Sequence, residues 1–238
     1  MRLNQGPEPA TGDDILARLL YRDALMLVID KPAGLPVHPG PGGGDTLVRH
    51  LDALRFGLPR RPEAAHRLDR DTSGCLVLGR HPKALAKLGK LFSGHRVDKT
   101  YWAVVEGEPE GESGAIDLPL ARRSDDPLSW WMKVDPAGDP SLTHWRVLGR
   151  DRAGRAWVEL RPVTGRTHQL RVHCAAMGWP ILGDTIYGRA PRQGGPGLHL
   201  HARALELPLY PSRPPVRVEA PAPAHMRAAL AACVSMPN

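Results

Sequence analysis

Short apolar segments, each followed by a turn-forming Gly, Pro or polar stretch, recur along this chain of 238 residues and limit its possible folds most strongly. Their length and their β-branched and aromatic content are typical of strands. The segments are Leu25–Ile29, Cys75–Leu78, Thr100–Val105, His144–Leu148, Ala156–Arg161 and His199–Leu205. Most are joined by short turns rather than crossover helices, which favours antiparallel pairing. The sequence therefore predicts a mixed α+β (mixed α/β) fold with a largely antiparallel sheet.

Helical patterns are fewer, and each has a recognisable start or stop. Leucines recur at helical spacing over 47–54, Pro82 opens a helix that Gly94 ends, a third pattern ends at Gly178, and His225–Cys233 closes the chain. No clean linker interrupts the pattern, so we expect a flexible N-terminal tail over 1–13 and one domain over 14–232.

Charge and cysteine usage limit the compartment and the partner. The chain has 32 Lys+Arg against 25 Asp+Glu, a net charge of +7, which favours a polyanionic partner such as nucleic acid. An aromatic content of 5% argues against a general stacking surface for single strands. Three distant cysteines, no secretory signal and no apolar run long enough to span a bilayer predict a cytosolic (cytoplasmic) protein without membrane contact.

The densest charged cluster is His66–Gly74, which runs directly into the apolar segment at Cys75. Its simplest interpretation is a solvated loop with local ion pairs. Asp69 and Asp71 each lie beside an arginine, which favours the ionised carboxylate. An ionised carboxylate is a poor general acid but a usable nucleophile or charge stabiliser. The pair therefore argues against a hydrolase that needs one carboxylic acid and one carboxylate.

A second cluster, Thr164–His173, places two arginines and two histidines at the start of a helix, where free amide groups favour an anion. The alternative is a capped amphipathic helix with a solvated face. If the two clusters face each other across a cleft, one supplies a carboxylate and the other the guanidinium that pairs with it.

Metal and nucleotide sites have weaker support. His168 and His173 are five residues apart, which does not align them on a helix, and His199 and His201 have no third ligand nearby in sequence. Gly40–Gly44 lacks the Lys-Ser/Thr ending of a phosphate-binding loop. We therefore expect no metal, nucleotide or organic cofactor.

The polar segment 121–141 is expected to form a long loop or ribbon. It carries Trp130-Trp131-Met132, which could pack as a hairpin against the body or contact a ligand. Packing is the interpretation we favour.

Four segments in this order resemble the RluA-like family of RNA pseudouridine synthases, and the match runs from about residue 20 to 225. They are Asp30–His38, His66–Gly74, Lys99-Thr100-Tyr101 and Thr164–His173, with later echoes at Pro180–Asp184 and Leu198–Ala202. The resemblance implies a pseudouridine synthase fold, in which a central, mainly antiparallel sheet flanked by helices is split by an active-site cleft.

The resemblance also implies residue roles. Asp69 would be the catalytic aspartate, which attacks the sugar or assists glycal formation, and Arg171 its ion-pair partner. Tyr101 would stack on the base and could take the proton from carbon 5, although a phenol with a pKa near ~10 is a poor base at neutral pH.

Three further residues would contact RNA. Arg67 would enter the RNA stack when the uridine flips out, Leu170 would pack against the base, and Arg166 would bind backbone phosphate. From the residues before position 20 we expect no N-terminal RNA-binding module of the S4 type, which many relatives carry. The chain thus resembles the short branch of the family, with target choice resting on the cleft and on loops 121–141 and 189–197.

The predicted function is isomerisation of specific uridines to pseudouridine in structured tRNA or rRNA stem-loops, by a monomeric enzyme. One alternative is a non-catalytic RNA-binding or RNA-folding protein on the same scaffold. Another is a glycosidase or nucleosidase, which would release free uracil.

Overall fold

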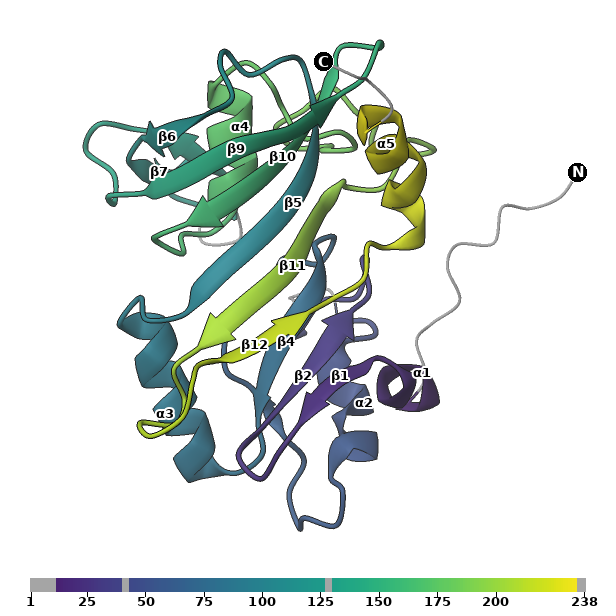
Figure 1. Cartoon of the computed structure of the whole chain (residues 1–238), viewed down its shortest axis with the longest axis vertical. Helices are drawn as coiled ribbons and strands as arrows, with labels where there is room; N and C mark the ends of the chain where they lie inside the picture. Colours follow the sequence, from purple (N-terminus) through teal and green to yellow (C-terminus); the bar gives the residue numbers. More distant parts are fainter. Residues whose placement is uncertain (1–11, 40–42, 127–129, 235–238) are drawn as a thin grey trace, which may run out of the picture.

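The computed structural model describes residues 12–39, 43–126 and 130–234 (Figure 1). Within these ranges a ten-stranded sheet forms the body, and β7 with β8 forms a separate two-stranded ribbon. The strands are β1 (Leu19–Arg22), β2 (Met26–Lys31), β3 (Glu63–Ala64), β4 (Ser73–Gly79), β5 (Asp98–Glu106), β6 (Ser113–Asp117), β7 (Leu120–Arg122), β8 (Met132–Val134), β9 (Leu142–Arg150), β10 (Arg155–Pro162), β11 (Leu200–Leu207) and β12 (Val216–Glu219). The helices are α1 (Gly12–Ala17), α2 (Leu47–His50), the 3₁₀ turn η1 (Leu51–Leu54), α3 (Pro82–Ser93), α4 (Gln169–Ala176) and α5 (Ala224–Val234).

The strands of the sheet follow the order β1-β2-β4-β11-β5-β10-β9-β6, with β3 paired to β4 and β12 to β11. β11 runs parallel to β4, where His201 pairs with Ser73 and Ala202 with Gly74, and antiparallel to β5. The other pairings along this path are antiparallel. The expected mixed α+β fold with a mainly antiparallel sheet is therefore confirmed.

The side chains of β5 show how the helices cover the sheet, because successive residues of a strand point to opposite faces. Val104 packs in a cluster with Met226 and Leu230 of α5. Its neighbours Ala103 and Val105 pack instead in the cluster that contains Leu170 and Cys174 of α4. The two helices thus lie on opposite faces, α5 in front and α4 behind in Figure 1.

Helix α3 forms where the sequence predicts it, for local reasons. Pro82 occupies the first turn, where its missing N–H costs nothing, and the His81 side chain accepts a hydrogen bond from the Ala84 amide at 3.2 Å. Leu88 and Leu91 are buried on one face, and the helix ends before Gly94. The helix therefore packs its apolar side on β4 while the region around Phe92 remains near the site described below.

One expectation needs correction. The helical pattern over 47–54 folds as one α-turn followed by a 3₁₀ turn, since Leu47, Leu51 and Leu54 can all be buried that way. Helix α1 begins at Gly12, inside the segment 1–13 that the sequence predicts as a tail, and residues 1–11 lie outside the described part. The two halves of the sheet meet over a short contact, because β4 and β11 pair only at Ser73–Gly74 and His201–Ala202.

The segment 121–141 does form a ribbon, in which Arg122 of β7 pairs with Met132 of β8. Residues 127–129 at its far end lie outside the described part. The preferred packing of Trp130 and Trp131 is wrong, because the two side chains are 46% and 37% exposed. Among the described residues, neither belongs to a buried apolar cluster.

Candidate active site

Asp69 lies on the loop between β3 and β4, and a buried lysine fixes that loop. The Lys31 side chain is fully buried, and its Nζ donates to the carbonyl oxygens of Pro32 and Leu35 at 2.8 Å and of Arg70 at 2.9 Å. Burial lowers the pKa of Lys31 to about 7, although the nearby Asp71 and Asp69 favour its charged form. Lys31 therefore connects the end of β2 to the residue that follows Asp69.

The other end of the loop is fixed by close contact between β4 and β11. Gly74 has φ +106°, and a Cβ there would overlap the backbone carbonyl group of Ala202. Beside it, the Ser73 hydroxyl lies 2.9 Å from Nδ1 of the fully buried His201. Only glycine allows this approach, so the loop leaves the sheet at a fixed point and in a fixed direction.

Arg171 projects from α4 toward Asp69 but makes its closest contacts with another carboxylate. Its Nε and Nη2 donate to Asp184 at 2.8 Å each, whereas its Nη1 lies 3.7 Å from Oδ2 of Asp69. Asp184 also accepts hydrogen bonds from the amides of Ile186 and Tyr187. Burial would raise the pKa of Asp184, but these hydrogen bonds, led by those of Arg171, hold it below its usual value.

This arrangement extends the expected Asp69–Arg171 pair. Arg171 is 4% exposed, and a buried guanidinium requires compensation for its lost hydration. Asp184 supplies that compensation through a two-bond contact, which fixes the plane of the guanidinium. The third nitrogen is left to face Asp69, so the guanidinium stabilises a negative charge there without being its tightest partner.

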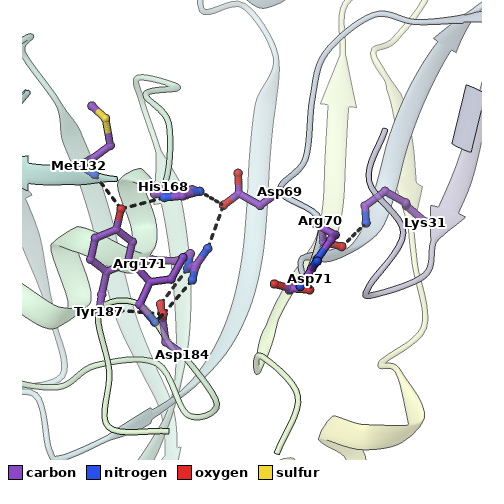
Figure 2. A network of polar contacts seen from close by, with 10 residues as sticks. Lys31, Asp69, Arg70, Asp71, Met132, His168, Arg171, Asp184 and Tyr187 are labelled. Carbon is purple, nitrogen blue, oxygen red and sulfur yellow. Dashed lines mark hydrogen bonds and ion pairs between the residues drawn. The ribbon is translucent and has the colours of Figure 1, made fainter. Parts of the chain in front are cut away.

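A second polar chain reaches Asp69 from the ribbon, as Figure 2 shows. The amide of Met132 donates to the Tyr187 hydroxyl at 2.8 Å, and that hydroxyl lies 2.8 Å from Nδ1 of His168. Nε2 of His168 in turn lies 3.8 Å from Asp69. The loop that carries Asp69 and the ribbon are thereby connected through two side chains.

The contacts of His168 favour one tautomer of its ring. Burial lowers its pKa, against the opposing effect of Asp69, so the ring is neutral at pH 7. The Tyr187 hydroxyl accepts from Met132 and has one proton that it can donate to Nδ1. With that donation, the proton of the neutral ring is on Nε2, the nitrogen that lies nearer to Asp69. His168 adopts φ +54°, an uncommon conformation for a residue other than glycine, to reach this position.

The two charged clusters meet in one cavity of about 550 Å³, within the range of roughly 300–1,000 Å³ typical of ligand sites. Asp69, His168 and Arg171 line it together with the apolar Leu170 and the aromatic Tyr101. Burial, then Asp69, raise the pKa of Tyr101 above its usual value, which disfavours the phenolate further. Tyr101 is therefore better suited to contact a base than to remove a proton.

The remaining residues of interest lie around this cavity. Arg67 and Arg166 are exposed and line it, and Arg166 also lies 3.6 Å from the Asp139 carboxylate. Asp71 pairs with the neighbouring Arg70 at the surface. His66 accepts a hydrogen bond from a backbone amide, and burial lowers its pKa to about 3, so it acts as a structural residue.

Sequence reasoning did not find Asp184, Tyr187 or the position of His168. The available signal was Arg171 itself, because a guanidinium on the buried face of a helix needs a carboxylate partner. Asp184 ends the family-like segment Pro180–Asp184, but nothing in the spacing of that segment connects it to Arg171. Among the described residues, no group of three or more His, Cys, Asp or Glu is arranged to hold a metal ion, and no helix is long and apolar enough to cross a membrane.

Known proteins share both the sequence and the fold. A family model described as RNA pseudouridylate synthase matches residues 25–176. An uncharacterized RNA pseudouridine synthase of Zymomonas mobilis is 46% identical, over 87% of this chain and 94% of that protein. The ribosomal large subunit pseudouridine synthase D of Xanthomonas campestris is 40% identical, over 94% of this chain and 71% of that protein. The solved structure of human RNA pseudouridylate synthase domain containing 4 superposes with a TM-score of 0.78 at 29% identity, covering 95% of this chain and 97% of that one.

Fold, cavity and sequence agreement together define an RNA-modifying isomerase, an RNA pseudouridine synthase. Within that class, the chain belongs to the RluA-like family of RNA pseudouridine synthases. The family resemblance predicted from its four segments is thus confirmed.

Proposed function

We propose that this enzyme isomerises specific uridines in structured stem-loops of tRNA or rRNA, with Asp69 as the catalytic carboxylate. The observation that carries the proposal is the position of Asp69: its side chain, 18% exposed, lies 3.7 Å from a buried guanidinium inside the cavity. A ribosomal RNA target is supported by relatives named ribosomal large subunit pseudouridine synthase D. We place the reaction in the cytoplasm.

The reaction moves one bond and conserves every atom of the RNA apart from exchange of a proton. The bond between N1 of uracil and C1′ of ribose breaks, the base turns, and C5 bonds to C1′. The proton on C5 leaves and N1 gains one. Asp69 acts on the ribose, by attack on C1′ or by assisting glycal formation, and both routes need an ionised carboxylate. Arg171 stabilises that ionised form and orients it.

The target nucleotide has to leave the RNA stack, because Asp69 lies inside a cavity that a stacked uridine cannot reach. Arg67, exposed at the edge of that cavity, is suited to enter the space the nucleotide leaves. Tyr101 and Leu170 form the surface on which the uracil turns. Arg166, exposed on the opposite cluster, is suited to bind a backbone phosphate.

Asp69→Asn tests the role of the carboxylate. RNA labelled with tritium at C5 of uridine releases its label as the new bond forms, so release measures turnover. We expect the rate to fall by about a thousandfold or more, while binding to unmodified RNA changes by no more than about threefold. An Asp69→Asn enzyme that still isomerises uridine would show that another group performs the chemistry.

Deleting the gene tests the substrate class. Mapping pseudouridine across total tRNA and rRNA of the deletion strain should reveal the loss of one or a few positions within stem-loops. If every position is unchanged, the proposed RNA targets are wrong.

A further inference from the structure

Two neighbouring tryptophans on the ribbon have no role in the fold or in the reaction as described. Trp130 and Trp131 precede β8 and are 46% and 37% exposed. Tryptophan is usually well buried, so two adjacent exposed indoles on a short ribbon indicate a surface that contacts something.

Arginines flank both indoles. The guanidinium carbons of Arg67 and Arg122 lie 6.0 and 5.7 Å from the Trp130 ring centre. Those of Arg123 and Arg192 lie 5.6 and 5.9 Å from the Trp131 ring centre. We call these six residues the tryptophan–arginine wall. Within the described ranges, none of its four guanidiniums is in an ion pair with a carboxylate. The wall is therefore a cationic surface that contains two partly exposed indoles.

The wall stands at the active site. Arg67 belongs both to the wall and to the lining of the cavity, and it precedes Asp69 by two residues. The ribbon contacts the rest of the protein directly after Trp131, where the Met132 amide donates a hydrogen bond to the Tyr187 hydroxyl. Through Tyr187 and His168 this contact continues to Asp69, as Figure 2 shows. The position of the tryptophans is thus fixed relative to the catalytic carboxylate.

We propose that the tryptophan–arginine wall binds unpaired nucleotides that flank the target uridine, with bases stacked on Trp130 and Trp131 and phosphates paired with the arginines. The proposal rests on the proposed function, since it assigns the wall to the same RNA. Flipping one uridine unstacks its neighbours, and aromatic faces are the usual replacement for lost base stacking. The unpaired guanidiniums match the phosphates that accompany those bases.

The proposed stacking of bases on the tryptophans is tested by binding of a fluorescently labelled single-stranded RNA of 12 uridines, measured by fluorescence anisotropy. Trp130→Ala and Trp131→Ala should each weaken binding by about tenfold, and Phe at either position should keep it within about threefold. A blunt 12-base-pair RNA duplex, which offers no free base, should bind all variants equally. Thermal melting should be unchanged, because both side chains are exposed.

The proposed pairing of the arginines with phosphates is tested by the salt dependence of the same binding. Arg123→Ala and Arg192→Ala should each reduce the slope of log K against log salt by about 0.7, the value for one phosphate contact on a single strand. The tryptophan variants should leave the slope unchanged. Arg152→Ala, an exposed arginine in the turn between β9 and β10, is the matched control and should change neither slope nor affinity.

Three results would overturn the proposal: wild-type affinity of the Trp→Ala variants for the 12-mer, a melting temperature lowered by several degrees, or an altered oligomeric state in sedimentation. The last would make the wall a protein contact. These outcomes are separate from the failure of the proposed function. If the wild-type enzyme forms no pseudouridine while RNA binding still depends on the two tryptophans, the assigned reaction is wrong and RNA binding by the tryptophan–arginine wall remains supported.

Discussion

Asp184→Asn removes the negative partner of a buried guanidinium while keeping the size of the side chain. Asp184 accepts two hydrogen bonds from Arg171 at 2.8 Å and two from backbone amides at 2.9 and 3.0 Å. The amide oxygen of Asn can keep the backbone bonds, but its NH₂ group opposes the guanidinium. Hydrogen bonds to charged groups contribute about 1.5–3 kcal/mol each, and breaking a buried pair costs about 3–5 kcal/mol. We therefore expect unfolding free energy to fall by about 3–5 kcal/mol.

Urea denaturation at pH 7 measures this loss. Asp52→Asn is the matched control, because Asp52 pairs with Arg55 at the surface and should contribute less than about 1 kcal/mol. A loss below about 1 kcal/mol for Asp184→Asn would refute the reasoning, since Arg171 would then not depend on this carboxylate. Activity at low urea should also fall about tenfold or more, because Arg171 loses the contact that fixes its plane toward Asp69.

The pH dependence of the same difference gives an independent check. The folded state lowers the pKa of Asp184, so the unfolded chain takes up the proton first as the pH falls. The carboxylate's contribution is therefore complete above its ordinary pKa of about 4 and is lost as the pH falls through the folded value. The difference between wild type and Asp184→Asn should be constant above about pH 5 and shrink below pH 4. A difference that grows on acidification would contradict this assignment.

Three further predictions concern the supports of the site. Tyr187→Phe removes the hydroxyl between Met132 and His168, so the rate should fall severalfold and the unfolding free energy by about 1–3 kcal/mol, measured by turnover and urea denaturation. Lys31→Met should destabilise the fold, and by about 2 kcal/mol more at pH 9 than at pH 7. The pKa of Lys31 is about 7 in the folded state and higher in the unfolded chain, so the wild-type protein becomes more stable as the pH rises between these values. An equal loss of unfolding free energy at both pH values would contradict this. Gly74→Ala should lower the unfolding free energy by more than about 3 kcal/mol in the same assay. Gly111→Ala, also at positive φ but with open space around it, should lower it by about 1 kcal/mol. Equal losses would exclude the steric cause.

Local patterns were sufficient for most of the elements. Helix α3 was predictable because Pro82, the leucine spacing and Gly94 all act within one helix. The turn between β9 and β10 was predictable for the same reason, since Asp151 accepts the amides of Ala153 and Arg155 within four residues. In both cases the residues that determine the element lie within the element itself or directly beside it.

The parts that were missed depend on partners far away in sequence. Asp184 could not be assigned because its partner Arg171 meets it only after α4 packs on the sheet. The exposure of Trp130 and Trp131 could not be predicted either, because an apolar pair on a ribbon is usually buried. The two tryptophans are adjacent in the sequence, but their place beside the loop that carries Asp69 is not visible there, because Arg67 meets Trp130 only in the folded chain.

The place of β11 in the sheet has a consequence for the synthesis of the enzyme. β11 (Leu200–Leu207) lies between β4 and β5, so it joins the strand that follows Asp69 to the strand that carries Tyr101. During translation, β4 leaves the ribosome long before the neighbour that fixes Gly74 in place. The nascent enzyme can therefore form hairpins early, but it cannot assemble its active site until nearly seven-eighths of the chain has been made. A ribosome that stalls before residue 200 would release a basic fragment in which the loop that carries Asp69 lacks its contact with β11.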